Sequence, residues 1–269
     1  MPEFLPISRA DMTRRGWDQC DFVYIIGDGY VDHPSFGHAI ISRVLEDAGY
    51  KVGILSQPDW KDPASIDALG EPRLGFLVMG GNMDSMVNHY TANKRLRSDD
   101  AYTPDQRPGM RPDYPSIVYT KMLKELYPDV PVVLGSIEAS LRRLTHYDYW
   151  QDKLLPGILA SSPADLLIYG MGEKPIKELV RRLKSGIPFN EIKDIRQTVY
   201  LADKEDAKDD DIVLFSHEEC LKDKLKQAKN FRHIEEESNK YNASRILQKV
   251  GKQVIVVNPP FPPMTEAEI

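Results

Sequence analysis

The feature that most constrains the fold is a repeated unit: an apolar run that ends in glycine and polar residues, followed by residues spaced as in an amphipathic helix. The first unit begins with the run at 21–28, continues into a helical pattern that stops near Gly49, and returns as a second strand at 51–55. A run that is apolar throughout is typical of a strand buried on both faces. The unit is short enough to be one right-handed β-α-β crossover.

The same unit recurs along the chain. Alternation of strands and helices is typical of a mostly parallel sheet with helices on both faces. We therefore predict a doubly wound α/β domain over residues 15–190. Its later strands are expected at 74–79, 130–134 and 166–169, and its later helices at 117–127, 138–144 and 176–183.

The pattern changes after this domain, and we predict an α+β extension over residues 191–257. Its longest element is a strongly charged stretch at 217–250, which we expect to be helical. Strands are expected at 198–201, 212–215 and 253–257. The tail at 258–269 contains four prolines and predicts a linker that leads to a further domain.

Residues 92–115 interrupt the repeated pattern with basic residues and four prolines. A loop of this length inside a domain is usually either functional or disordered. A solvated, partly mobile excursion explains the composition equally well.

Composition excludes several classes of protein. The 35 basic and 41 acidic residues give a net charge of −6, whereas general nucleic-acid binders are usually basic. No apolar run approaches the roughly 20 residues that cross a bilayer, so we expect no membrane span. The sparing use of cysteine indicates a reducing, cytoplasmic setting. The two cysteines, Cys20 and Cys220, form no CxxC motif, and the six histidines show no paired ligand spacing. We therefore expect no metal site within this chain.

Candidate ligand-binding residues follow the predicted strands. In a doubly wound sheet, ligands bind beyond the carboxyl ends of the strands, and glycine there allows close approach of the backbone. Tight turns after strands also favour glycine, which is the alternative explanation for each cluster. The candidates are Gly29, Gly80, Gly81, Asn82, Asp84, Ser85, Gly135, Ser136, Ser140, Arg142, Gly170, Gly172 and Glu173.

Four side chains near the same edge are candidates for acid–base or substrate-orienting roles, because carboxyl and imidazole groups perform most proton transfers in enzymes. The nucleotide motifs are weak or missing: Gly170-Met171-Gly172 lacks the third glycine of GxGxxG, and no P-loop occurs. The four candidates are Asp28, Asp32, His33 and Glu138.

Several longer strings resemble those of YgiQ-family radical-SAM proteins. The most extensive is Val-Leu-Gly-Ser-Ile-Glu-Ala-Ser-Leu-Arg-Arg at 133–143, followed by His-Tyr-Asp-Tyr-Trp at 146–150. The strings at 82–87, 97–104 and 28–34 and the Asn-Pro-Pro at 258–260 extend the resemblance over nearly the whole chain.

The resemblance implies a two-part enzyme. A flavodoxin-like, cobalamin-binding-like N-terminal domain would precede a radical-SAM barrel whose CxxxCxxC motif holds a [4Fe-4S] cluster and cleaves S-adenosylmethionine. No such cysteine triplet occurs here, so the chain would be the N-terminal part, truncated before the barrel. Its partner would be the barrel of the same polypeptide, acting on a small-molecule or modified macromolecular substrate in a reaction that the sequence does not define.

Cobalamin binding is a separate question under this resemblance. Domains that coordinate cobalt through histidine carry Asp-x-His-x-x-Gly, but here Asp32 and His33 are adjacent and Gly37 follows. A mode without a histidine ligand would use the glycine-rich edge, with Gly135-Ser136 and 170–173 flanking the corrinoid.

Two alternatives do not depend on radical chemistry. The chain could be a free-standing module for a nucleotide or small anion, using Gly80, Gly81, Gly135 and Ser136. It could instead be a non-catalytic interaction domain that docks through 217–250. An exposed apolar stripe on that segment would favour the interaction domain, and a stripe packed on the sheet would weaken it.

Overall fold

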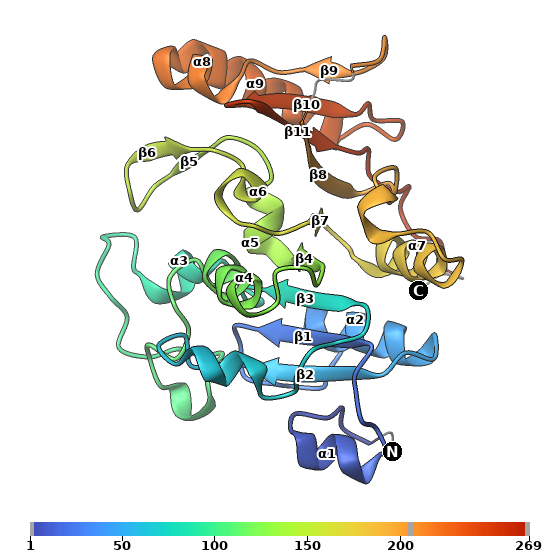
Figure 1. Ribbon diagram of the computed structural model, residues 1–269. Coiled ribbons are helices and arrows are strands. Elements are labelled where there is room, and N and C mark those ends of the chain that lie inside the picture. Colours follow the sequence, from blue (N-terminus) through green and yellow to red (C-terminus); the bar gives the residue numbers. More distant parts are fainter. Residues whose placement is uncertain (1–2, 204–206, 267–269) are drawn as a thin grey trace.

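The strands form one long sheet and one small hairpin in the computed structural model, which describes residues 3–203 and 207–266 (Figure 1). The main strands are β1 (Phe22–Ile26), β2 (Val52–Ser56), β3 (Gly75–Met79), β4 (Val132–Gly135), β7 (Leu166–Ile168), β8 (Thr198–Ala202), β9 (Ile212–Val213), β10 (Ile246–Val250) and β11 (Gln253–Val257). The hairpin pairs β5 (His146–Asp148) with β6 (Lys153–Leu155).

The helices lie on both faces of the sheet. No helix within the described residues is both long enough and apolar enough to cross a membrane. The helices are α1 (Arg9–Arg14), α2 (Gly37–Asp47), α3 (Ser85–His89), α4 (Pro115–Leu126), α5 (Ser136–Leu141), α6 (Ile158–Ser161), α7 (Glu173–Lys184), α8 (His217–Lys222) and α9 (Lys224–Ser238).

The order of the strands fixes where ligands can bind. Across the sheet the order is β2-β1-β3-β4-β7-β8-β11-β10-β9, and the first five strands are all parallel. The chain moves from β1 to one side for β2 and to the other side for β3, so the topological switch point lies between β1 and β3. The predicted doubly wound, mostly parallel sheet is confirmed.

Alternate residues of each strand form two separate cores. In β1, Val23 and Ile25 pack with α4, α5 and α6, whereas Phe22 and Tyr24 pack on the opposite face with α2 and α7. This alternation follows from the period of two in an extended chain. Each fully buried aliphatic or aromatic side chain contributes about 1.5–3 kcal/mol, so both layers are held by burial. Only α2 and α7 among these helices cover the second face, and they contact each other.

The prediction of one helix over 217–250 is wrong. The segment forms α8, α9 and then β10, because Asp223 takes an extended conformation between the helices and caps α9 through its side chain. Ile246 and Leu247 are core residues of β10, which pairs antiparallel with β11. Their spacing suits a buried strand as well as a helix, and pairing with β11 decides between the two.

The C-terminal extension continues the same sheet. Strand β8 pairs antiparallel with both β7 and β11, so hydrogen bonds run unbroken across the proposed boundary at residue 190. The start of the proline-rich tail lies against this region: Gln197 N–H donates to Pro259 O (2.8 Å), and the Arg196 side chain donates to Pro260 O (2.7 Å). The last three residues of the predicted linker, 267–269, lie outside the described residues.

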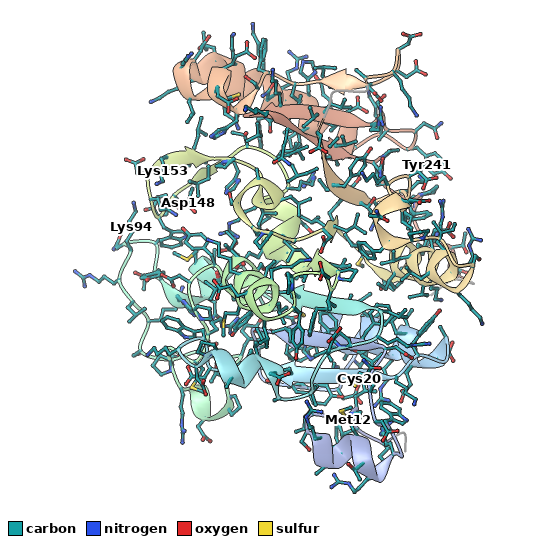
Figure 2. All side chains as sticks on the ribbon, in the orientation of Figure 1. Met12, Cys20, Lys94, Asp148, Lys153 and Tyr241 are labelled. Atoms are coloured by element: carbon teal, nitrogen blue, oxygen red, sulfur yellow. The ribbon has the colours of Figure 1, made fainter. Side chains whose placement is uncertain are left out.

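The segment 92–115 is anchored by a buried arginine. The Arg111 side chain has 0% exposure and donates to Asp28 Oδ1 (2.7 Å) and to Asp100 Oδ1 (2.9 Å). Asp28 follows β1, so this ion-paired cluster ties the segment to the sheet. Other residues of the segment, such as Lys94 at the outer edge of the molecule in Figure 2, remain exposed.

Replacing Arg111 tests this anchor. Arg111→Met should lower the free energy of unfolding by about 3–5 kcal/mol, because it leaves two buried carboxylates without their counter-charge. Equilibrium urea unfolding measures the effect. The matched control, Arg107→Met in the exposed part of the segment, should change it by less than about 0.5 kcal/mol. Equal midpoints for both variants would contradict the anchoring role.

Candidate functional site

The sequence-predicted clusters lie at one edge of the sheet. Asp28, Gly80 and Gly170 follow β1, β3 and β7, Gly135 ends β4, and these four strands are parallel neighbours. Their carboxyl ends therefore meet at the same edge, as the sequence predicts. The clusters divide into two groups there, a buried polar network and an open cleft.

The buried network occupies the switch point. Asn82 N–H donates to Asp28 Oδ2 (2.7 Å), and Arg111 also donates to Gly80 O (3.3 Å). Gly81 has φ +135°, and a Cβ atom there would collide with both Arg111 and Asp28. Burial raises the pKa of the Asp28 carboxyl, although the charge of Arg111 opposes the shift. Protein side chains thus fill the crevice in which doubly wound domains commonly bind ligands.

Glu138 is a buried anchor between helices. Its carboxylate has no exposure and accepts hydrogen bonds from the N–H groups of Ser85 (3.1 Å) and Ser116 (3.2 Å), at the starts of α3 and α4. A Cβ atom on Gly80 would lie 2.8 Å from Glu138 Cδ, so glycine is required there. These bonds satisfy helix N–H groups that have no partner within their own helices.

The remaining polar candidates extend this network. Asp84 caps α3 by accepting from Met86 N–H (3.0 Å), and it forms an ion pair with Arg142. The Ser140 hydroxyl donates to Ser136 O (2.7 Å) and accepts from Gly170 N–H (3.1 Å). Ser140 therefore links the ends of β4 and β7.

Asp32, His33 and Gly29 lie in the loop after β1. Asp32 forms an ion pair with Arg43 of α2. His33 is exposed, and its Nδ1 atom accepts from Ser35 N–H (3.1 Å). Gly29 N–H donates to Tyr102 O (2.7 Å), beneath the segment that Arg111 anchors. None of these three contributes to the open cleft.

The open cleft lies on the face of the sheet that α2 and α7 cover, between the first turns of these two helices. Its volume is about 130 Å³. Apolar side chains of the strands, including Leu77, Val133 and Ile168, form its walls, and Gly135, Ser136, Gly170, Gly172 and Glu173 line its edge. The structure thus brings together five sequence-predicted residues at a place where a ligand could enter.

Two polar atoms of the cleft lack partners. Ser136 Oγ and Glu173 Oε2 are buried, and neither has a hydrogen-bond partner among the described residues. Ser136 also has φ 75°, a left-handed conformation that is unfavourable for a residue with a side chain. Unpaired buried polar atoms and local strain concentrate at functional sites. The unpaired atoms and the left-handed residue therefore lie at the same edge of the cleft.

Several cleft residues carry no sequence signal. Gly37, Ile40 and Ile41 come from the first turn of α2, and Tyr24 comes from the middle of β1. Ile41 lies within the helical pattern that the sequence shows before Gly49. Its position in the cleft depends on how α2 crosses the sheet, which no local pattern reports.

Metal ligands are not gathered anywhere in the described part of the chain. No group of three or more His, Cys, Asp or Glu side chains could hold a metal ion there. Cys20 lies near β2 and Cys220 lies on α8 at the opposite end of the sheet (Figures 1 and 2). Burial raises the pKa of Cys20 to about 11, which keeps its thiol protonated. These residues do not fit a [4Fe-4S] cluster, which is held by several thiolates.

The helical part of the extension has an apolar surface. Leu221 of α8 is 56% exposed, and Leu225 and Phe231 of α9 are 71% and 59% exposed. Phe231 lines a groove together with Leu144 and Tyr147 of the preceding domain. The exposed apolar residues expected of an interaction surface are therefore present, although they belong to two helices.

Glu138→Gln tests the anchoring carboxylate. Both carboxylate oxygens of Glu138 accept hydrogen bonds from backbone N–H groups. Glutamine has an NH2 group in place of one of these oxygens, so one backbone N–H would face another donor and lose its acceptor. We expect a loss of about 1–3 kcal/mol in the free energy of unfolding. Chemical denaturation measures it, with Glu125→Gln on the exposed side of α4 as the control. Equal stability of the two variants would show that the buried carboxylate is dispensable.

Comparison with known proteins identifies the family. A family model described as Radical SAM N-terminal matches residues 4–269. The UPF0313 protein of Porphyromonas gingivalis is 61% identical over an alignment that covers 100% of this chain and 43% of that protein. The UPF0313 protein of Bacteroides thetaiotaomicron is 60% identical, with 100% and 46% covered. The UPF0313 protein of Methanocella arvoryzae is 50% identical, with 98% and 44% covered.

The chain spans less than half the length of these relatives. The resemblance to radical-SAM proteins that the sequence strings carry is confirmed by the match over nearly all residues. The chain belongs to the Radical SAM N-terminal family.

Proposed function

We propose that this chain is the accessory, ligand-binding domain of a radical-SAM enzyme, and that the cleft between α2 and α7 receives part of the substrate or of a corrinoid. The observation that carries the proposal is the pairing of apolar walls with two unsatisfied polar atoms, Ser136 Oγ and Glu173 Oε2. Small-molecule sites typically combine an apolar lining with a few polar groups that orient the ligand.

The chemistry of the cleft selects the ligand group. Glu173 offers a hydrogen-bond acceptor, and the Ser136 hydroxyl can donate or accept. A carboxylate at the first turn of α7 repels an anion that the helix N-terminus would otherwise attract. The preferred group is therefore flat or compact, largely apolar and equipped with an N–H or O–H donor. This reasoning disfavours the alternative of a phosphate-binding module.

A corrinoid would enter this cleft only in part. The volume of about 130 Å³ suits a single ring system rather than a whole macrocycle. Asp32 is paired with Arg43, and the spacing of a histidine cobalt ligand is missing, so we assign no cobalt ligand in this chain. A side group of the corrinoid, or of the substrate, would fill the cleft while the remainder lies above the sheet edge.

The radical chemistry belongs to the rest of the protein in this proposal. S-Adenosylmethionine and a [4Fe-4S] cluster supply the radical, and this chain contributes binding and orientation. Asp28 and Glu138 are fully buried in the hydrogen-bond network, while Asp32 and His33 lie in the loop after β1. Their roles as acid–base groups remain predictions.

A second candidate function is attachment of the radical-SAM domain of the same polypeptide. The exposed Leu221, Leu225 and Phe231 of α8 and α9 favour it, and Phe231 lines a groove with Leu144 and Tyr147. Replacing Leu225 and Phe231 by serine would weaken contact between the two domains without altering the cleft.

Gly135→Leu tests the cleft. Gly135 has an extended backbone, and a Cβ atom there meets no atom within 4 Å, so leucine fills the cleft without strain. The whole protein carrying this change should bind hydroxocobalamin and co-purifying small molecules about tenfold more weakly or worse, since the cleft no longer admits a ring. Titration followed by visible absorption measures the binding of hydroxocobalamin. Native mass spectrometry measures the retention of co-purifying small molecules.

The matched control is Ala10→Leu, an exposed position on α1. It should bind as the unaltered protein does, and circular dichroism should show that both variants are folded. Unchanged retention of every ligand by Gly135→Leu would refute binding in the cleft.

A further inference from the structure

A second cavity lies beneath the segment 96–113, next to α3 and α4. Its volume is about 350 Å³, within the range of small-molecule sites. Trp60, His89, Leu96, Arg97 and Val118 are among its lining residues. Val118 belongs to α4, which covers the face of the sheet opposite the cleft, so the two spaces are separate.

A histidine oriented by a carboxylate faces this cavity. His89 Nδ1 lies 2.7 Å from Asp113 Oδ1, and the Tyr90 hydroxyl donates to Asp113 Oδ2 (2.9 Å). An ionised carboxylate only accepts hydrogen bonds, so Nδ1 is the donor, and in the neutral imidazole Nε2 carries the lone pair. His89 is 8% exposed, and its buried Nε2 atom has no hydrogen-bond partner among the described residues.

A positively charged side chain, Arg97, belongs to a residue that is hydrogen-bonded to this histidine through the backbone. Arg97 N–H donates to His89 O (2.8 Å), which holds Arg97 next to His89. Arg111 forms ion pairs with Asp28 and Asp100. Arg97 lines the cavity and has no ion-pair partner within residues 3–203 and 207–266. Three carboxylates also line the cavity: Asp100 pairs with Arg111, Asp113 contacts His89, and Asp99 accepts from the Ser98 hydroxyl (3.4 Å).

We propose that the cavity is a binding site for a small organic anion that also carries a hydroxyl group. Arg97 pairs with the anionic group, His89 Nε2 accepts the hydrogen bond from the hydroxyl, and Trp60 and Leu96 cover the carbon skeleton. Asp113 is the positioning residue that orients the ring and holds the neutral imidazole in the tautomer with its proton on Nδ1. The anion is a phosphate monoester or a carboxylate, and both present the same charge and hydroxyl chemistry.

Calorimetric titration of the whole protein tests this site with four probes: glycerol 3-phosphate, glycerate, inorganic phosphate and glycerol. The first two carry both groups, and each of the others carries one. The probe of the correct anion class should bind about tenfold more tightly than phosphate or glycerol, because a charge-assisted contact and a hydroxyl contact then act together. The comparison of glycerol 3-phosphate with glycerate identifies the anion.

Three variants assign the contacts. Arg97→Gln should weaken binding of the anionic probes about tenfold, because it removes the positive charge. His89→Gln should weaken only the hydroxyl-bearing probes and leave phosphate unchanged. Asp113→Asn should weaken binding of the same hydroxyl-bearing probes as His89→Gln does. It should also change which ring nitrogen of His89 carries the proton, and the ¹⁵N chemical shifts of the imidazole report this change. Asp113 is 42% exposed, so this variant is expected to fold.

The controls are Arg95→Gln, an exposed cation of the same segment, and His33→Gln, an exposed histidine outside the cavity. Both should bind as the unaltered protein does. Absence of binding by all four probes, or equal binding by Arg97→Gln and Arg95→Gln, would overturn the site. Equal loss of phosphate and of glycerol 3-phosphate in His89→Gln and Asp113→Asn would overturn the hydroxyl contact.

Discussion

A guanidinium group buried at the switch point between β1 and β3 determines which parts of this edge of the sheet are open to a ligand. Arg111 reaches from the long segment after α3 into the crevice and pairs with Asp28 and Asp100 without exposure to solvent. Doubly wound domains usually keep that crevice for a ligand. Here a protein side chain occupies it, and the anchored segment covers it. Open space is found to either side of this crevice, over the two faces of the sheet.

The two spaces that remain differ in chemistry because different elements form them. The cleft between α2 and α7 has apolar walls made by the strands, with the strained Ser136 and the unsatisfied Glu173 at its edge. The cavity below residues 96–113 presents His89 and Arg97, and its walls come from a segment that Arg111 itself holds in place. One buried ion-paired cluster thus fills the usual crevice and holds in place the segment over the second cavity.

Family membership and geometry bear on different parts of the problem. The Radical SAM N-terminal match and the UPF0313 relatives connect the chain to radical-SAM proteins, whereas the residues of this chain do not fit an iron–sulfur cluster. In the proposed function, its side chains contribute binding and orientation. The exposed apolar side chains of α8 and α9 lie on the extension of the sheet, away from the cleft. Contact with another domain there would leave the cleft accessible.

Local patterns in the sequence determined the parallel sheet, its two cores and the convergence of Asp28, Gly80, Gly135 and Gly170 at one edge. Strands that are buried on both faces are apolar throughout, so they recur as a pattern in the sequence. The carboxyl ends of parallel strands lie at the same edge of the sheet. The tertiary structure decided the rest. Arg111 is one of several basic residues in a polar segment, and its burial depends on Asp28, 83 positions away in sequence. The contact between His89 and Asp113 and the contribution of α2 to the cleft also depend on distant partners. The strand β10 depends on its pairing with β11 and β9, and periodicity along one segment reports none of these contacts.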